Sequence, residues 1–316
     1  MNQIEEIIKS WRALDVVKLA STDRSAVLAL LELLSNPDTA VRLRTLAALA
    51  ELVEGTDDGT KKFLLNHGLE PLTKLLSDDD PRVVHRTIEV LARLLKSVPL
   101  DEKRFLQLLN SAVEVMKNGD TLARLSLIDL FGRIQVPSLS EEGLSKVHSI
   151  ASSDFLWVRL LGLRVLLSSG RLEGYEERLV EGLESLLLSG NALTIELGIG
   201  LLMEIMRFHS TPGAMKALSR FPSILKAVET GGGDVFLRRK AAEARKNLEE
   251  TLLAYYGSRH DEALEAARAL LGDGRGEDAL FLLFTIGRTD LLSHLWGDAR
   301  AAESEPMKVL GLERAL

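Results

Sequence analysis

The chain has 316 residues, of which 46% are hydrophobic and 27% are charged, a composition typical of a folded protein and not of a disordered one. Its formal net charge of −7 weighs against a protein whose main task is nucleic-acid binding, because such proteins usually carry a basic balance. The absence of cysteine excludes a disulfide framework, a cysteine-based zinc site and a thiol nucleophile, and it fits a reducing compartment. Aromatic residues make up only 5%, while the helix formers leucine and alanine dominate, so the sequence predicts an all-α fold.

The N-terminal segment has the pattern of an amphipathic helix over residues 1–18, and it carries Glu5, Glu6 and Asp15. It lacks the basic start and the apolar centre of a secretory signal peptide. No apolar run in the sequence reaches the roughly 18 residues that a membrane-spanning helix needs. We therefore expect a soluble cytoplasmic protein without a membrane partner, in which residues 1–20 form an N-terminal capping helix.

Two stretches that lie 42 residues apart have matching sequences, which indicates an internal repeat. Ten of the 21 aligned positions from 33 to 53 and from 75 to 95 are identical. In the first stretch, helices are predicted over residues 22–34 and 39–53, separated by the breaker Asn36-Pro37-Asp38. A repeat of this length is typical of stacked helical units, each of which buries its apolar faces only against its neighbours.

The second unit contains the best-preserved motif. Short helices are predicted over residues 61–66 and 69–76, with a turn at His67-Gly68 between them, and a long helix is predicted over 81–96. The string that resembles the armadillo repeat, a unit of three helices, is Phe63-Leu64-Leu65-Asn66-His67-Gly68-Leu69-Glu70-Pro71-Leu72 followed by Leu75-Leu76-Ser77-Asp78-Asp79-Asp80. The first unit, with Leu33-Leu34 through Val41-Arg42, is equally similar to the related HEAT repeat, which has two helices.

Later parts of the chain repeat the pattern less faithfully, as pairs of helices in which a breaker precedes the second helix. The breakers are Asn118-Gly119-Asp120, Ser152-Ser153-Asp154, Ser189-Gly190-Asn191 and Gly231-Gly232-Gly233-Asp234. The predicted pairs are 108–116 with 122–134, 143–151 with 155–167, 175–188 with 192–208, and 215–228 with 235–256. Beyond them, shorter helices are expected over 261–271, 277–286 and 290–296, and a last one from about residue 306.

The resemblance is clearest over residues 22–134 and continues in weaker form to residue 256. It implies an all-α fold, a right-handed α-solenoid (α-α superhelix) of armadillo/HEAT-like repeats. We accordingly expect an N-terminal cap at residues 1–20, about six repeats over 21–256, and a helical C-terminal cap and tail over 257–316.

The pattern Asp-x-x-x-Arg recurs where the long helices begin, at Asp38/Arg42, Asp120/Arg124 and Asp234/Arg238. One interpretation is a basic track along one face. We favour the other, in which the aspartate caps the helix and the arginine pairs with it or with an aspartate of the next unit. Such links would hold the register between stacked repeats.

In peptide-binding armadillo proteins, the last helix of each unit carries an asparagine that hydrogen-bonds the backbone of an extended peptide. The matching positions here are Glu51, Arg93, Arg133 and Ser168, so the resemblance does not extend to this peptide clamp. The rows one and two turns earlier are Ala47, Glu89 and Asp129, and Arg44, Arg86 and Ser126. These rows form a strip of mixed charge, which suits a charged, folded partner and equally suits an ordinary solvated helix face. The residues predicted to bind a partner protein, called the charged strip below, are Arg44, Glu51, Arg86, Glu89, Arg93, Asp129, Arg133 and Arg164.

Two predicted helices are too apolar for a helix with one solvated face, namely 192–208 and the start of 155–167. A helix that is hydrophobic on most sides is buried on most sides. We favour a cover formed by the C-terminal segment Leu280-Phe281-Leu282-Leu283-Phe284. The alternative is a partner or a second copy of the chain, which would give a homo-oligomer through the apolar region 155–206.

No recognisable catalytic or metal-binding motif occurs in the sequence. The six histidines lie far apart, and none has the i, i+4 spacing of a helical metal site. Gly272-Asp273-Gly274-Arg275-Gly276 lacks the Lys-Ser/Thr of a phosphate loop and predicts a turn. We therefore expect no metal, no cofactor and no enzymatic activity.

The repeat favours a non-catalytic scaffold or adaptor that binds another protein on the concave face of the solenoid. Two alternatives stay open. One is a HEAT-like nucleic-acid-binding protein that uses concave arginines such as Arg86 and Arg133, although the acidic balance of the chain weighs against it. The other is a structural subunit of an oligomeric complex.

Overall fold

The computed structural model describes residues 3–10, 12–170, 174–231 and 234–292, and every regular element in these ranges is a helix. This confirms the all-α class that the sequence predicts. The chain divides into two compact units, Met1–Gly170 (unit 1) and Arg171–Leu316 (unit 2), each a stack of helices in its own right. The helix expected from about residue 306 lies outside the described residues.

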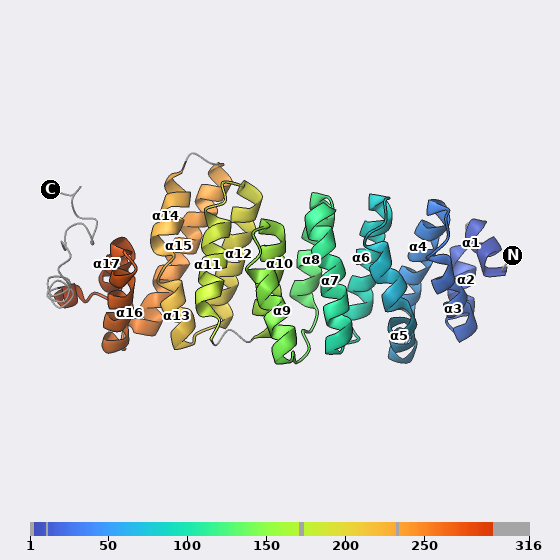
Figure 1. Ribbon diagram of the computed structural model, residues 1–316, viewed down its shortest axis with the longest axis horizontal. Helices are drawn as coiled ribbons and strands as arrows, with labels where there is room; N and C mark the ends of the chain where they lie inside the picture. The colour runs from blue at the N-terminus through green and yellow to red at the C-terminus, as the bar shows by residue number, and fades with distance from the viewer. Residues whose placement is uncertain (1–2, 11, 171–173, 232–233, 293–316) are drawn as a thin grey trace. The chain divides into compact units, whose positions relative to one another are not determined.

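Unit 1 consists of helical hairpins that follow an N-terminal helix pair (Figure 1). Its helices are α1 (Gln3–Lys9), α2 (Ala13–Ala20), α3 (Arg24–Leu33), α4 (Thr39–Gly55), α5 (Asp58–Leu75), α6 (Pro81–Leu95), α7 (Glu102–Asn118), α8 (Thr121–Arg133), α9 (Glu141–Ala151) and α10 (Leu156–Ser169). The hairpins are α3/α4, α5/α6, α7/α8 and α9/α10, so each sequence repeat corresponds to one hairpin.

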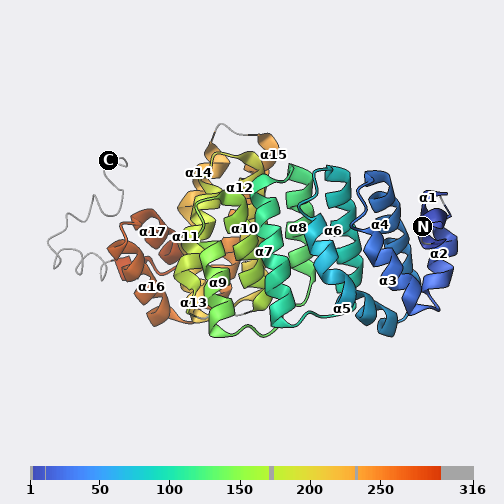
Figure 2. The same ribbon diagram turned by 45° about the vertical axis from the view of Figure 1, so that its right-hand side comes forward.

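The hairpins of unit 1 stack into two layers (Figure 2). Helices α3, α5, α7 and α9 contact one another in turn and form the first-helix layer, while α2, α4, α6, α8 and α10 form the second-helix layer. The core lies between the layers, where Leu30, Leu46, Leu91, Phe105 and Phe131 are fully buried. Each unit thus buries its apolar side chains against the next, as the repeat predicts.

Aspartates start the long helices of the second-helix layer. The side chain of Asp38 accepts a hydrogen bond from the backbone N of Ala40 (2.8 Å), and that of Asp80 accepts one from Arg82 N (2.9 Å). Asp120 does the same for Ala123 N at the start of α8 (2.8 Å). These side chains satisfy amides that have no partner within the helix, which confirms the predicted capping role.

The second repeat has two helices and not the three of an armadillo unit. The predicted short helices 61–66 and 69–76 are one continuous helix, α5, and the predicted turn at His67-Gly68 is wrong. Gly68 is buried, and a Cβ at this position would lie 3.0 Å from a methyl carbon of Leu31 on α3. The glycine therefore serves the close approach of α3 and α5 and does not end a helix.

Two other predicted helices are divided in the structure. The helix expected over residues 1–18 is the pair α1 and α2. The helix expected over 215–228 is the pair α13 (Pro212–Leu218) and α14 (Pro222–Thr230). The second break occurs at Pro222, which starts α14 and has no amide hydrogen with which to continue the preceding helix.

Unit 2 contains a second set of packed helices. Besides α13 and α14 they are α11 (Glu176–Leu187), α12 (Ala192–Phe208), α15 (Val235–Tyr256), α16 (His260–Gly272), α17 (Gly276–Thr285) and the 3₁₀ helix η1 (Thr289–Leu291). α11 pairs with α12, α14 with α15, and α16 with α17. A turn joins α16 to α17 as predicted, with Gly274 in the left-handed conformation (φ 74°).

The C-terminal segment 280–284 does not form the expected cover of the apolar helix α12. Within unit 2, α12 packs against α11 and α15, whereas α17, which contains this segment, packs against α14, α15 and α16. The long helix α15 packs alongside α12 and is linked to it by the Lys240–Glu196 ion pair (2.6 Å), and the α12 side chains Ile199 and Leu202 are buried. In unit 1, the apolar helix α10 is buried against α7, α8 and α9.

A buried carboxylate on α17 completes the start of α14. Asp278 is 1% exposed, and it accepts hydrogen bonds from Ser223 N (2.7 Å), Ser223 Oγ (2.8 Å) and Arg275 Nε (3.0 Å). The N-cap residue of α14, Phe221, supplies no side-chain cap, so Asp278 takes that role from another helix. Burial raises the pKa of Asp278, while the hydrogen bonds from Ser223 and the charge of Arg275 act in the opposite direction.

Candidate partner-binding surface

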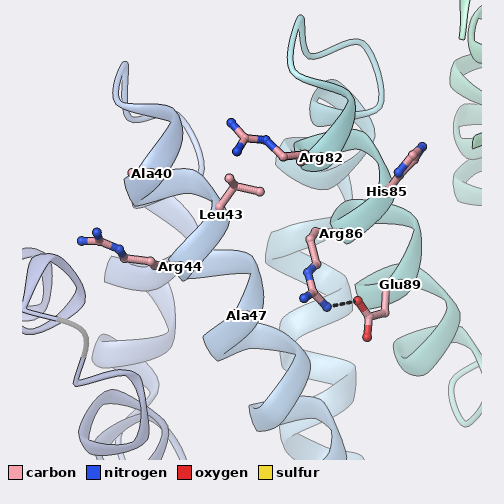
Figure 3. A pocket seen from close by; sticks show the side chains of 8 residues that line it. All are labelled: Ala40, Leu43, Arg44, Ala47, Arg82, His85, Arg86 and Glu89. Atoms are coloured by element: carbon pink, nitrogen blue, oxygen red, sulfur yellow. Dashed lines mark hydrogen bonds and ion pairs between the residues drawn. The ribbon is translucent and has the colours of Figure 1, made fainter. Parts of the chain in front are cut away.

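A groove of about 700 Å³ lies between α4 and α6 on the second-helix layer of unit 1 (Figure 3). Leucines on the opposite side of both helices are buried in the core, and this packing positions the two helix backbones that border the groove. Its lining residues are Ala40, Leu43, Arg44, Ala47, Arg82, His85, Arg86 and Glu89.

Two successive repeats line this groove with the same four positions. Each lining residue of α4 has its counterpart 42 positions later on α6, and the pairs are Ala40/Arg82, Leu43/His85, Arg44/Arg86 and Ala47/Glu89. The α4 members include two alanines, whereas the α6 members are all polar. The groove therefore has one small, largely apolar wall and one charged wall.

Two arginines of α6 project into the gap toward α4. Figure 3 shows the side chains of Arg82 and Arg86 on the side of α6 that Leu43 faces. Arg82 pairs with Asp80 through its Nη2 (2.7 Å to Oδ2), and Arg86 Nη1 lies 2.5 Å from Oε2 of Glu89. These arginines thus present positive charge to the groove while they also contact carboxylates of their own helix and its cap.

The other two basic lining residues point away from the gap (Figure 3). Arg44 extends toward the N-terminal helices, where its Nη1 donates to the carbonyl oxygen of Lys9 (2.8 Å). His85 extends toward α8, where its Nε2 lies 3.1 Å from both carboxylate oxygens of Asp120. Both residues tie one helix of the second layer to the neighbouring unit.

The carboxylates beside the groove are held in their charged form. Hydrogen bonds from the side chain and the backbone N of Arg82 lower the pKa of Asp80 to about 2. Partial burial acts to raise the pKa of Glu89, but the ion pairs with Arg86 and Arg93 lower it overall. The groove therefore keeps its full pattern of opposite charges at neutral pH.

Most of the predicted charged strip is joined by ion pairs. Arg93 binds Glu89 on its own helix (2.6 Å) and Glu54 on α4 (2.9 Å), so a chain of charges connects α4 with α6. Asp129 and Arg133 pair along α8 (2.9 Å). Of the three remaining members, Arg44 contacts the carbonyl oxygen of Lys9 as described above, Glu51 is exposed on α4, and Arg164 is partly exposed on α10.

Two of the positions that match the armadillo asparagine bind the backbone of the preceding repeat. Arg93 Nη1 donates to the carbonyl oxygen of Ala50 (3.5 Å), and Ser168 Oγ donates to that of Phe131 (3.1 Å). Arg164 Nη2 likewise reaches the carbonyl oxygen of Gly132 (3.3 Å). These side chains hold adjacent second helices together, a use different from clamping a peptide backbone.

The arginines near the helix starts link the loops of successive repeats. Arg42 forms an ion pair with Asp78 of the next unit (Nε–Oδ2 2.9 Å), and the two side chains are only 14% and 8% exposed. Arg42 also donates to the carbonyl oxygen of Asn36 (2.9 Å), as Arg124 does to that of Lys117 (3.0 Å). The predicted pairing with an aspartate of the next unit is confirmed at Arg42.

Sequence reasoning placed Arg44, Ala47, Arg86 and Glu89 in the rows of this surface, named Arg82 only as a concave arginine for the nucleic-acid alternative, and missed Ala40, Leu43 and His85. These residues could have been found by extending the aligned rows, which are 42 residues apart, one helical turn beyond Arg44 and Arg86 toward the start of each helix. The same row on α8 contains Leu122, which is 59% exposed.

The described ranges contain no group of three or more histidine or acidic side chains that could hold a metal ion. None of the helices in those ranges is long and apolar enough to cross a membrane.

Comparisons with known proteins identify the architecture. No protein-family model matches the sequence, and no curated protein matches it. Among solved structures, the chain is similar to the archaeal HEAT-like repeats protein from Thermococcus onnurineus NA1, with 24% identity and a TM-score of 0.62 over 79% of this chain and 97% of that one. It is also similar to importin beta (14% identity, TM-score 0.47, 83% of this chain and 34% of that one). A designed armadillo repeat protein matches with 14% identity and a TM-score of 0.41 over 70% of this chain and 99% of that one.

The two-layer stack of helical hairpins and the likeness to the archaeal protein define the fold as an armadillo/HEAT-type helical repeat, an all-α solenoid. In unit 1 the repeats are two-helix units of the HEAT kind, as α5 demonstrates.

Proposed function

We propose that the protein is a non-catalytic scaffold or adaptor that binds a partner protein on the second-helix layer of unit 1. The observation that carries this proposal is the groove between α4 and α6, whose two walls are equivalent positions of successive repeats. Stacked repeats produce extended binding surfaces in this way, because each unit presents the same face to solvent.

The residues that line the groove support docking of a macromolecule. Ala40, Leu43 and Ala47 offer a shallow apolar wall, and Arg82 and Arg86 stand opposite to them. Arginine beside apolar surface is characteristic of protein interfaces, where its long side chain contributes both contact area and directed hydrogen bonds.

The acid–base groups of the groove have structural partners, which supports a binding role over a catalytic one. His85 contacts both carboxylate oxygens of Asp120 at 3.1 Å, and Glu89 is held between Arg86 and Arg93. The other members of the charged strip, from Glu51 to Arg164, form the border of the proposed surface.

The proposal is tested by filling the groove. Ala40→Trp and Ala47→Trp place an indole in the space between α4 and α6, and Ala254→Trp, at an exposed position of α15 in unit 2, is the matched control. Each tagged full-length chain is used to capture proteins from native extract, which are quantified by mass spectrometry.

We expect proteins that are retained by the wild type and by the Ala254→Trp variant but lost from both groove variants. Circular dichroism checks that all four chains keep the same helix content. An identical set of captured proteins for all four chains would remove the groove from consideration.

A further inference from the structure

We propose that the groove between α4 and α6 binds an extended acidic peptide segment that also carries an apolar side chain. This inference rests on the proposed function and names the chemistry of the partner. The juxtaposition that carries it is Arg82 and Arg86 on one wall and Leu43 on the other (Figure 3).

The spacing of the two arginines fits carboxylates at alternate positions of an extended chain. Residues four apart on a helix are separated by about 6 Å along its axis. Side chains at positions i and i+2 of an extended peptide point the same way and lie about 6.6 Å apart. Arg82 and Arg86 can therefore each receive one carboxylate, and the planar guanidinium suits a paired hydrogen bond to it.

Both arginines can exchange partners at small cost. The side chain of Arg82 is 74% exposed and that of Arg86 is 54% exposed, and ion pairs this accessible to water contribute little to stability. If a peptide carboxylate replaces Glu89 at Arg86, Glu89 keeps its ion pair with Arg93 (2.6 Å). If a second peptide carboxylate replaces Asp80 at the Arg82 guanidinium, Asp80 keeps the hydrogen bond that it accepts from the backbone N of Arg82 (2.9 Å).

The apolar wall provides room for a hydrophobic side chain between the acidic ones. Ala40 and Ala47 end at Cβ, which leaves the partly exposed Leu43 as the contact. Side chains of an extended peptide alternate in direction, so a residue between two acidic ones can turn toward α4. Removal of this surface from water adds affinity that is independent of charge.

The surrounding charges favour a peptide over a nucleic acid. Glu89 lies within the groove, and Asp80 and Asp120 pair with its lining residues Arg82 and His85. A continuous phosphate backbone would meet these carboxylates at every step, on a chain whose net charge is −7. A peptide can place its acidic residues only where the arginines are.

The test begins with a random-peptide display library selected on the immobilised full-length chain, with the Ala47→Trp variant used for counter-selection. Enriched sequences are synthesised with a fluorophore, and their binding is measured by anisotropy to the wild type and to the Arg82→Gln/Arg86→Gln double variant. Lys62→Gln, at an exposed position on α5 in the first-helix layer, is the matched control. An oligonucleotide of equal net charge is measured in parallel.

We expect enriched sequences with Asp or Glu at alternate positions and an apolar residue between them. Affinity should fall at least about tenfold in the double variant, since each charge-assisted hydrogen bond contributes about 1.5–3 kcal/mol and 1.4 kcal/mol is tenfold. Affinity should stay unchanged in the Lys62→Gln control and should weaken as ionic strength rises to about 0.15 M.

Three outcomes would overturn the inference, and they differ in what they leave standing. Enriched sequences that are basic or neutral, yet lose binding in the Ala47→Trp variant, contradict the acidic segment and leave the scaffold proposal intact. Oligonucleotide binding as tight as that of the best peptide assigns the groove to nucleic acid instead. A library that yields no sequence preferring the wild type over Ala47→Trp contradicts peptide binding in the groove and leaves the scaffold proposal to the capture experiment.

Discussion

Gly162 lies where α10 crosses closest to α9, and its replacement by alanine should destabilise unit 1. A Cβ at this position would lie closest to the backbone N of Ala151, and it would lie 2.6 Å from the Cα of Ala151 and 2.7 Å from the carbonyl carbon of Ile150. Ordinary contacts of a Cβ begin at 3.4 Å, so the two helix backbones would have to separate by more than about 0.8 Å. No side-chain rotation can relieve a contact with backbone.

The expected change in the free energy of unfolding of Gly162→Ala is the difference between two opposing effects. Alanine is favoured over glycine by about 1 kcal/mol in a helix interior. Overpacking of a well-filled site costs about 1–3 kcal/mol and occasionally more, and a backbone contact belongs at the upper end of this range. We therefore expect Gly162→Ala to lower the free energy of unfolding by about 2 kcal/mol.

The matched control is Gly200, a helical glycine of α12 whose added Cβ would meet nothing within 4 Å. Gly200→Ala should raise the free energy of unfolding by about 0.5–1 kcal/mol. Unfolding in guanidinium chloride, followed by circular dichroism, measures both changes, provided that the slope of the unfolding free energy against denaturant concentration is the same in the variants and the wild type. Shifts of the same sign in the two variants would refute the close-approach argument.

Two further predictions concern carboxylates of unit 1. Arg42→Ala should lower the free energy of unfolding by about 2 kcal/mol, because it removes a little-exposed ion pair with Asp78. A double-mutant cycle with Asp78→Ala should give a coupling energy above about 0.5 kcal/mol. A coupling energy near zero would contradict the register role. The pKa of Asp80 is lowered from 3.8 to about 2, so the stability that its charge adds is complete above pH 3.8 and is lost as the pH falls through about 2. The stability difference between the wild type and Asp80→Asn, measured by urea unfolding at several pH values, should therefore shrink from about pH 4 to pH 2; a difference that stays constant over this range would contradict the assignment.

Helix positions were predictable wherever a cap and a breaker coincide. The predicted helices 192–208 and 235–256 have the observed bounds, and the side chain of Asn191 accepts from both Leu193 N (3.1 Å) and Thr194 N (3.2 Å) at the start of α12. The role of Gly68 could not be predicted from the sequence, because a glycine that ends a helix and one that admits a neighbouring helix look alike there. Only the position of Leu31 on α3 separates the two uses.

The candidate site was predictable in part, for a similar reason. The repeat offset brought Arg86 and Glu89 to one face, because both lie on the same helix and their spacing fixes their neighbourhood. The groove itself depends on the distance between α4 and α6 and on how little space Ala40 and Ala47 occupy. The contact of Arg93 with the carbonyl oxygen of Ala50 likewise depends on how neighbouring helices cross. That the charged strip binds a partner stays a prediction.

The capping of α14 by Asp278 ties α17 to the start of an earlier helix of unit 2. In an ideal linear array, terminal repeats can be trimmed and the remainder persists with reduced stability. Here a residue 55 positions further along the chain satisfies the first amides of α14. A chain that ends before α17 would leave the first amides of α14 without this cap. We expect the start of that helix, which belongs to the preceding hairpin, to fray.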